Sequence, residues 1–262
     1  AKQVFYLSGV PRSGSTVLAS LLNQNPDFYV TQTSPVLDSM QTISSAWGRL
    51  SANVLDQDPT QLKNILRGMH SNAYAHTPAS YIVDKHRAWP ASIDYIQDIT
   101  DIRPKIICTT RDISEIIASF IILIDKTEGV SYIDRELIES SKPINTATRA
   151  RLLWEKYINV PWASLRKGWQ QHPDCIKFID YTSIVNTPDI ALADIYNFLE
   201  VPVYTEHTTT KLKPMHENDA AWGLPGLHYI RPTLKKTSPP ASDILGKELA
   251  EYYNSLNLEF WK

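Results

Sequence analysis

Short apolar runs alternate along the chain with stretches in which apolar residues recur at helical spacing. The run QVFYLSG (3–9) ends at Gly9, and a proline follows two residues later, which favours a buried strand. From Thr16 onward the apolar residues return every three or four positions, as on one face of a helix. The N-terminal segment therefore predicts a strand joined to a helix by a tight turn.

Three further strands are predicted by apolar runs, and each of the three segments has a polar side chain toward its carboxyl end. They cover residues 79–87 with Lys85 near the end, 105–112 with Arg111, and 175–185 with Tyr181. Helical patterns separate these strands. The alternation predicts an α/β fold of three layers, α/β/α, with a central parallel sheet and right-handed crossovers. Ligands of such sheets gather at the carboxyl ends of the strands.

The rest of the chain is read as helices and one long loop. Residues 38–75 and 132–170 have helical spacing, and so has the C-terminal segment from 246. Residues 211–243 are rich in proline and lack periodicity, and long loops in compact domains are commonly functional. Since neither repeats nor linkers interrupt the pattern, residues 1–262 are expected to form a single domain.

Composition and charge narrow the class of protein. The chain has 262 residues and a formal net charge of −2, which disfavours a nucleic-acid partner because binding a polyanion needs a basic excess. Two cysteines are too few for a disulfide framework, and no metal site is expected. The apolar run 116–124 is too short to span a membrane. We therefore expect a cytoplasmic protein without a membrane partner.

The turn after the first strand resembles a phosphate-binding loop. Its sequence SGVPRSGST has the two glycines of a Walker A motif, but Ser15 stands where that motif has its lysine. Glycines allow close backbone approach to an anion, and the amides of the following helix point at it. The side chains that could add hydrogen bonds are Arg12, Ser13, Ser15 and Thr16, with Gly14 between them. An ordinary turn is the competing interpretation.

The missing lysine must be replaced if this loop holds a phosphate. In nucleotide triphosphatases that lysine reaches the terminal phosphates, and the next Ser or Thr holds magnesium. A loop that keeps its glycines and Thr16 could bind a phosphate without metal, provided that another strand supplies the cation. Lys85, at the end of the second predicted strand, is the obvious candidate.

Together these motifs resemble the sulfotransferases that use 3′-phosphoadenosine 5′-phosphosulfate (PAPS). The segment PRSGST (11–16) is similar to the loop that binds the 5′-phosphosulfate in that family, whose fold is of the P-loop nucleotide-binding type. Arg111 and Ser119 stand eight residues apart, as do the arginine and serine that bind the 3′-phosphate. Eight residues are just over two helical turns, so that both side chains can reach one phosphate.

The resemblance assigns further roles, most closely in the tyrosylprotein-type branch and its bacterial relatives. Lys85 matches the lysine that contacts the bridging oxygen of the leaving phosphate, and Tyr181 matches a tyrosine near the adenine. A basic C-terminal loop is also typical, and residues of the corresponding region here are Arg231, Lys235 and Lys236. For these three, a solvated basic loop is an equal alternative.

A general base for the acceptor hydroxyl is less clear. The tyrosylprotein group has a glutamate shortly after the first helix, where this chain offers only Asp38. Cytosolic members have a histidine two residues after the lysine, and His86 is one residue out of that register. We take His86 as the first candidate, because imidazole suits proton transfer near pH 7, then Asp38, then His70 or His76.

The expected activity is in-line sulfuryl transfer from PAPS, without a metal, to a hydroxyl of a small-molecule or peptide acceptor, with Lys85 and Arg12 in catalysis. Helical residues 38–75 and 125–170 and the proline-rich loop are expected to form the acceptor pocket. Two alternatives remain open. One is a P-loop phosphotransferase, with Asp84 or Asp112 as a magnesium ligand, and the other is a non-catalytic module that binds PAPS or its product, PAP.

Overall fold

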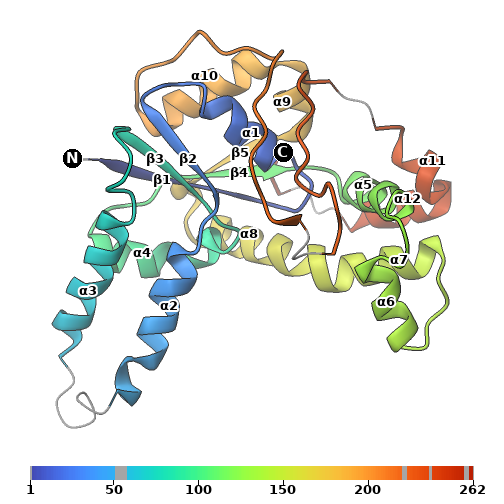
Figure 1. Cartoon of the computed structure of the whole chain (residues 1–262), viewed down its shortest axis with the longest axis horizontal. Coiled ribbons are helices and arrows are strands. Elements are labelled where there is room, and N and C mark those ends of the chain that lie inside the picture. Colours follow the sequence, from blue (N-terminus) through green and yellow to red (C-terminus); the bar gives the residue numbers. More distant parts are fainter. Residues whose placement is uncertain (1, 51–57, 220–222, 236–237, 257–259, 262) are drawn as a thin grey trace.

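Five parallel strands form the central sheet of the computed structural model (Figure 1), in the order β2-β3-β1-β4-β5. The structure describes residues 2–50, 58–219, 223–235, 238–256 and 260–261. The strands are β1 (Gln3–Gly9), β2 (Phe28–Thr33), β3 (Tyr81–Lys85), β4 (Ile106–Thr110) and β5 (Ile176–Asp180). The predicted α/β fold with a parallel sheet is confirmed.

Helices cover both faces of this sheet. They are α1 (Ser15–Leu22), α2 (Val36–Ala46), α3 (Pro59–Asn72), α4 (Ile93–Thr100), α5 (Ile113–Asp125), α6 (Tyr132–Glu139), α7 (Thr146–Leu152), α8 (Asn159–Gln171), α9 (Tyr181–Asn186), α10 (Pro188–Leu199), α11 (Ala241–Leu245) and α12 (Lys247–Ser255). Short 3-10 turns are η1 (Trp47–Arg49), η3 (Trp89–Ser92) and η5 (Pro173–Cys175), and η4 (Leu153–Ile158) is a π-helical segment between α7 and α8.

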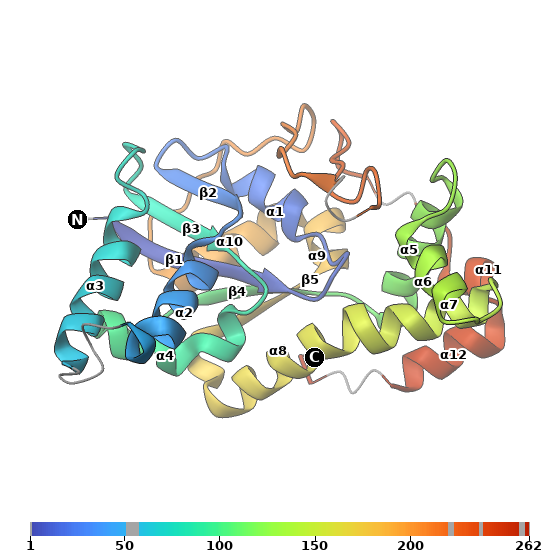
Figure 2. The ribbon, with the colours of Figure 1, turned by 60° about the horizontal axis from the view of Figure 1, so that its bottom comes forward.

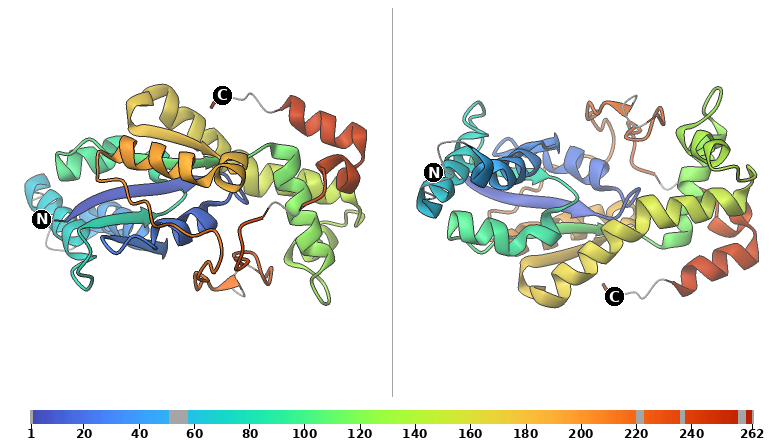
Figure 3. Two further views of the ribbon diagram at one scale, coloured as in Figure 1. Left: turned by 90° about the horizontal axis from the view of Figure 1, so that it is seen from above. Right: turned by 90° about the horizontal axis from the view of Figure 1, so that it is seen from below.

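The two layers of helices follow from the alternation of side chains along the strands. Phe5 and Leu7 of β1 pack with α1 and α10, whereas Tyr6 between them packs with α4, α5 and α8 on the other face. Figure 2 shows α1, α9 and α10 on one side of the strands and α2, α4 and α8 on the other. Seen from below, α8 crosses under the sheet and continues beyond its carboxyl edge (Figure 3).

Two sequence-based predictions of strands were wrong. β2 lies within a segment that we had not assigned to a strand, although Phe28 and Val30 alternate as buried residues on an edge strand. The strand predicted over residues 175–185 ends at Asp180 in the structure, and Tyr181 is the first residue of α9. The Asp180 carboxylate accepts a hydrogen bond from the backbone N–H of Thr182, and this cap starts α9.

The carboxyl ends of the strands lie at one edge of the sheet. Lys85 of β3 is in register with Leu7 of β1 and Thr33 of β2, and Gly9 of β1 is in register with Thr109 of β4. The described part of the predicted 211–243 loop is irregular up to α11, apart from a bridge between Thr210 and Thr233. Figure 1 shows that the loop runs past this edge of the sheet.

Gly168 makes the close contact of α8 with η3 possible, and a methyl group there should destabilise the fold. A Cβ at Gly168 would lie 2.3 Å from the carbonyl oxygen of Pro90, whereas a Cβ at Gly68, in the middle of α3, would meet nothing within 4 Å. We expect Gly168→Ala to lower the free energy of unfolding by about 1–3 kcal/mol. Gly68→Ala is the matched control, and it should raise stability by roughly 0.5–1 kcal/mol because alanine favours the helix. Urea unfolding of both variants measures the difference, and equal effects would contradict the packing argument.

Candidate active site

The phosphate-loop candidate lies between β1 and α1, as the sequence predicts. Gly14 caps α1 in the left-handed region, with φ 90°, and a Cβ there would lie 2.8 Å from the ring of Tyr181. Glycine is therefore required both by the backbone and by the close approach of the aromatic ring. The amide groups of the first turn of α1 have no partners within the helix and form the start of an anion site.

Arg12 joins this loop to two distant segments. Its Nε donates a hydrogen bond to Ser119 Oγ at 3.1 Å, and its Nη1 donates one to the carbonyl oxygen of Leu227. Burial, together with the positive charge of Arg111, lowers the pKa of Arg12 to about 10. Two guanidinium groups thus lie close together in a partly desolvated place, which favours an anion between or beside them.

Arg111 is oriented by three groups around it. Its Nη1 donates to the carbonyl oxygen of Arg12 at 3.0 Å, and its guanidinium carbon lies 4.2 Å from the centre of the Tyr181 ring. Its Nε pairs with Glu115, one turn along α5, at 3.1 Å. The residues expected to hold the 3′-phosphate therefore meet at one place, with Arg12 linking Arg111 to Ser119.

The three hydroxyl groups of the loop have different surroundings. Ser13 is completely buried, and its Oγ is hydrogen-bonded to the carbonyl oxygen of Val10 at 2.5 Å and to the Thr109 hydroxyl at 2.6 Å. Ser15 lines a cavity, and Thr16 Oγ1 accepts a hydrogen bond from Lys85 Nζ at 3.2 Å. The Ser13 side chain thus holds the loop on β4, and Ser15 and Thr16 remain at its open side.

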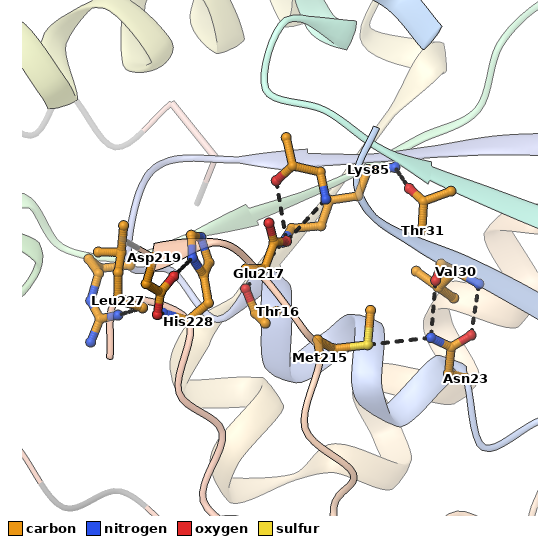
Figure 4. Close-up of polar contacts among 12 residues, drawn as sticks. Thr16, Asn23, Val30, Thr31, Lys85, Met215, Glu217, Asp219, Leu227 and His228 are labelled. Atoms are coloured by element: carbon orange, nitrogen blue, oxygen red, sulfur yellow. Dashed lines mark hydrogen bonds and ion pairs between the residues drawn. The ribbon is translucent and has the colours of Figure 1, made fainter. Parts of the chain in front are cut away.

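Lys85 forms a buried ion pair with a residue of the long loop (Figure 4). Its Nζ lies 2.7 Å from Glu217 Oε1, and the two side chains are only 9% and 6% exposed. The same Glu217 oxygen also accepts hydrogen bonds from the backbone N–H and the hydroxyl of Thr33, at 3.0 and 3.2 Å. Burial lowers the pKa of Lys85, and the charge of Glu217 opposes this shift only in part. The pKa of Glu217 is lowered as well: burial acts to raise it, but the charge and hydrogen bond of Lys85 outweigh burial.

Asp219 and His228, both of the long loop, form an acid–base pair beside that ion pair (Figure 4). His228 Nδ1 lies 2.6 Å from Asp219 Oδ1, and the His228 backbone N–H donates to the other carboxylate oxygen at 3.0 Å. A carboxylate at Nδ1 holds the proton on that nitrogen and leaves the lone pair of the neutral ring on Nε2. Burial lowers the pKa of His228, which Asp219 only partly opposes, so that the ring is neutral at pH 7.

A cavity of about 250 Å³ opens beside Lys85 and His228. Its polar wall comes from the strand ends and from His228, and its apolar wall from α5, α6, η4 and the long loop. The apolar lining residues are Leu7, Phe120, Tyr132, Ile133, Tyr157, Leu224 and Leu227. Tyr157 belongs to the π-helical segment, a distortion that is frequent at functional sites. Described residues of 38–75 do not line it, in contrast to our expectation for the acceptor pocket.

His86 and Asp38, the first two candidates for the base, contact each other. His86 Nε2 lies 3.3 Å from Asp38 Oδ2, and His86 Nδ1 accepts the backbone N–H of Ala88 at 3.2 Å. His86 lines the cavity, whereas the Asp38 side chain is 68% exposed. The amide at Nδ1 keeps the proton of the neutral ring on Nε2, so that both ring nitrogens are engaged.

The other two histidines lie away from the cavity. His70 is buried under the sheet, where its Nε2 is hydrogen-bonded to the hydroxyl of Tyr6 at 2.9 Å and burial lowers its pKa to about 4. His76 is exposed before the start of β3 and packs on Tyr29, with ring centres 5.2 Å apart. Since β3 ends at Lys85, His76 lies near the opposite edge of the sheet.

For the predicted basic clamp, the structure gives the exposure of two of its three residues. Arg231 and Lys235 are both exposed, and their role in phosphate binding stays a prediction. Lys236 lies outside the described residues.

The sequence analysis missed the three titratable residues that the long loop brings to Lys85: Glu217, Asp219 and His228. Their signal is the polar segment HEND (216–219) within a loop that had been marked as functional. Loop spacing has no period that could show which of these side chains points at the strand ends. The positions of these side chains depend on contacts between distant residues, such as that of Lys85 with Glu217, about 130 residues later.

Metal and membrane candidates were also sought in the described residues. No group of three or more histidine, cysteine, aspartate or glutamate side chains there could hold a metal ion. The helices that the structure describes are too short or too polar to cross a bilayer.

Known proteins resemble this chain at the level of family and fold. The sulfotransferase domain from the curacin biosynthetic pathway is 18% identical, with 97% of this chain and 96% of that chain covered and a TM-score of 0.53. Mouse sulfotransferase SULT7A1, complexed with PAP, is 14% identical, with 97% and 83% covered and a TM-score of 0.54. Retinol dehydratase, in complex with androsterone and the inactive cofactor PAP, is 14% identical, with 98% and 81% covered and a TM-score of 0.55. The sequence matches none of the curated proteins.

Residues 5–206 match the profile of the Sulfotransferase family. This match spans the phosphate loop, Lys85, Arg111, Ser119 and Tyr181, and it ends shortly before Glu217. The chain therefore belongs to the sulfotransferase family and is a sulfotransferase enzyme.

Proposed function

We propose that this protein, acting as one domain, transfers the sulfuryl group of PAPS to a hydroxyl of a small-molecule acceptor. Membership of the family supports sulfuryl transfer in general. PAPS as the donor is supported by the resemblance of the loop and of Arg111 with Ser119, and by two neighbours of the same fold that contain PAP. A small acceptor is supported by the volume and the apolar wall of the cavity.

The position of Lys85 carries this proposal. Its Nζ lies 3.2 Å from Thr16, which belongs to the phosphate loop, and Lys85 also lines the cavity. An ammonium group at the boundary between an anion site and an apolar cavity is where a leaving phosphate oxygen needs stabilisation. The charge that a Walker A loop carries at the position of Ser15 comes here from the end of β3.

The donor site would be built from the loop and the arginine cluster. The amides that follow Gly14, with Ser15 and Thr16, would bind the 5′-phosphosulfate at the start of α1. Arg12, Arg111 and Ser119 would bind the 3′-phosphate, and Tyr181, next to Gly14 and Arg111, would contact the adenine. A phosphate would compete with Glu115 for Arg111 and would be held by two guanidinium groups.

His228 is the general base that the geometry favours. The acceptor oxygen attacks sulfur while the bond from sulfur to the phosphate oxygen breaks, and the hydroxyl proton passes to His228 Nε2. Asp219 at Nδ1 stabilises the imidazolium that forms. Glu217 is a weaker candidate because three donors already bind one of its oxygens and hold its pKa below the usual range. In this assignment Glu217 orients Lys85.

The two alternatives receive less support. A phosphotransferase would need a carboxylate at a strand end for magnesium, but Asp84 is buried and accepts hydrogen bonds from Tyr74 and from Trp89 Nε1, the latter at 2.7 Å. A non-catalytic module has no need of an oriented pair such as Asp219–His228 at the wall of the cavity.

Binding of nucleotides tests the donor assignment. We expect PAP at about 100 times its Kd to raise Tm without magnesium by roughly 5–10 °C, because it binds only the folded state. ATP with magnesium should give a smaller shift. The reverse order in thermal unfolding curves would favour a kinase, and PAP binding without consumption of labelled PAPS, over a panel of phenols and alcohols, would favour the non-catalytic module.

Lys85→Ala should abolish turnover and leave PAP binding largely intact. Removal of a charge stabiliser at the leaving oxygen costs about 10²–10³ in rate or more. Turnover of labelled PAPS and the Tm shift with PAP measure the two effects separately. Lys63→Ala, which removes a lysine paired with Asp101 on the surface, is the control and should change neither. Near-normal turnover of Lys85→Ala would refute the role of this residue.

The pH dependence of turnover identifies the base. Since burial lowers the pKa of His228 below its usual 6.5, the ring is neutral at pH 7, and kcat/KM should fall only as the pH drops below about 6.5. Asp219→Asn removes a group that raises this pKa, so the acid limb should move to lower pH. We expect His228→Asn to lower kcat by about 10² or more and His86→Asn to have a smaller effect. A larger loss in Glu217→Gln or His86→Asn than in His228→Asn would contradict the assignment.

A further inference from the structure

The basic side chains around the cavity differ in whether a carboxylate contacts them. Four lysine, arginine or histidine residues line it among the described residues, and none of the described lining residues is acidic. Three of the four contact a carboxylate that is not itself among the lining residues. These contacts are Lys85 to Glu217 at 2.7 Å, His228 to Asp219 at 2.6 Å and His86 to Asp38 at 3.3 Å. The fourth is Arg87.

Arg87 has no such partner. In the part of the chain that the structure describes, no side chain forms a hydrogen bond or an ion pair with its guanidinium, although its backbone carbonyl accepts the hydroxyl of Ser8 at 3.0 Å. The residue is exposed, and the space that it faces is the cavity.

The guanidinium of Arg87 is available to an anionic ligand in the cavity. Its five N–H donors form a rigid fork that no described side chain engages, and the proposed donor site already has the cations that its phosphates need in Arg12, Arg111 and Lys85. The wall shared with Arg87 is apolar on the side of α5, α6 and η4. A molecule that fits this wall therefore has an apolar body with one anionic group.

We propose that Arg87 binds a carboxylate of the acceptor, so that the enzyme acts on hydroxy acids with an apolar body. This inference rests on the proposed function, because it gives the class of acceptor for the same site. The acceptor carboxylate would accept two parallel hydrogen bonds from the guanidinium, and its hydroxyl would reach His228 at the other part of the wall. Arg87 is then a specificity-determining residue that holds the acceptor and takes no part in proton transfer.

Binding of matched acids and amides to the PAP-loaded protein tests the proposal. The probes are 3-(4-hydroxyphenyl)propanoate and a series of ω-hydroxyalkanoates, each compared with its neutral amide by calorimetry. The wild type should bind the best acid about 10- to 100-fold more tightly than its amide, as expected for charge-assisted hydrogen bonds. Arg87→Gln should reduce this preference to about twofold or less without weakening the amide, and Arg87→Lys should keep part of it.

Arg49→Gln is the matched control, since Arg49 is an exposed arginine of η1 at the end of α2 and should leave the preference unchanged. An equal loss for acid and amide in Arg87→Gln would overturn the proposal, because Arg87 would then support the cavity without recognising the carboxylate. No preference for acids in the wild type, or no binding of any probe, would also overturn it. The Tm shift with PAP is recorded in the same samples, and its absence would refute the proposed donor instead.

Discussion

The buried pair of Lys85 and Glu217 is the contact on which the geometry of this site depends. Both side chains are less than 10% exposed, and their atoms approach to 2.7 Å. Loss of either partner would leave a buried charge without compensation, which costs several kcal/mol in proteins. The pair therefore fixes Lys85 at the end of β3 and also fixes a loop that the chain forms some 130 residues later. Such a pair defines a specific arrangement more than it adds stability.

The long loop completes the site through three separate contacts. Glu217 binds Lys85 and Thr33, Leu227 accepts a hydrogen bond from Arg12, and Asp219 holds His228 beside the cavity. The first contact joins the loop to the sheet and the second joins it to the phosphate loop. The proposed donor and acceptor sites therefore share one wall, and a movement of the loop would alter both. A segment without regular secondary structure can in this way position side chains at the candidate site.

The sequence predicted well the positions of those candidate residues that follow regular elements. Lys85, Arg111 and the phosphate loop each follow an apolar run, and parallel strands bring such ends to one edge whatever their distance along the chain. It failed where position depends on contacts of high sequence separation. β2 is a short edge strand that ends in exposed residues, and its last residue, Thr33, binds Glu217. Both the strand and the acid were missed, since neither pattern nor spacing relates residue 33 to residue 217.

The same limit explains why the sequence alone does not identify the general base. The family glutamate is absent from the segment after the first helix, but Glu217 reaches Thr33 in that very segment from the loop. A carboxylate therefore lies beside the segment that follows the first helix, although that segment itself has no glutamate. Its oxygen is nevertheless saturated by three donors, whereas His228 keeps Nε2 for a substrate by giving Nδ1 to Asp219. The two acids therefore differ in their effects. The donors around Glu217 make Glu217 a weaker base, whereas Asp219 makes His228 a stronger one.

Because Ser15 stands where a Walker A loop has its lysine, the positive charge lies at a different place relative to the phosphates. A lysine on the loop lies along the phosphates, whereas a lysine at the end of β3 lies between the loop and the cavity, in contact with Thr16 on one side and Glu217 on the other. Arg12 and Arg111, which we propose to bind phosphate, lie beside the phosphate loop, and Arg87 lies on the side of the cavity. Because the cations are distributed across both sites, each reactant can be bound by its own charge. Lys85 is then reserved for the oxygen whose charge increases during transfer.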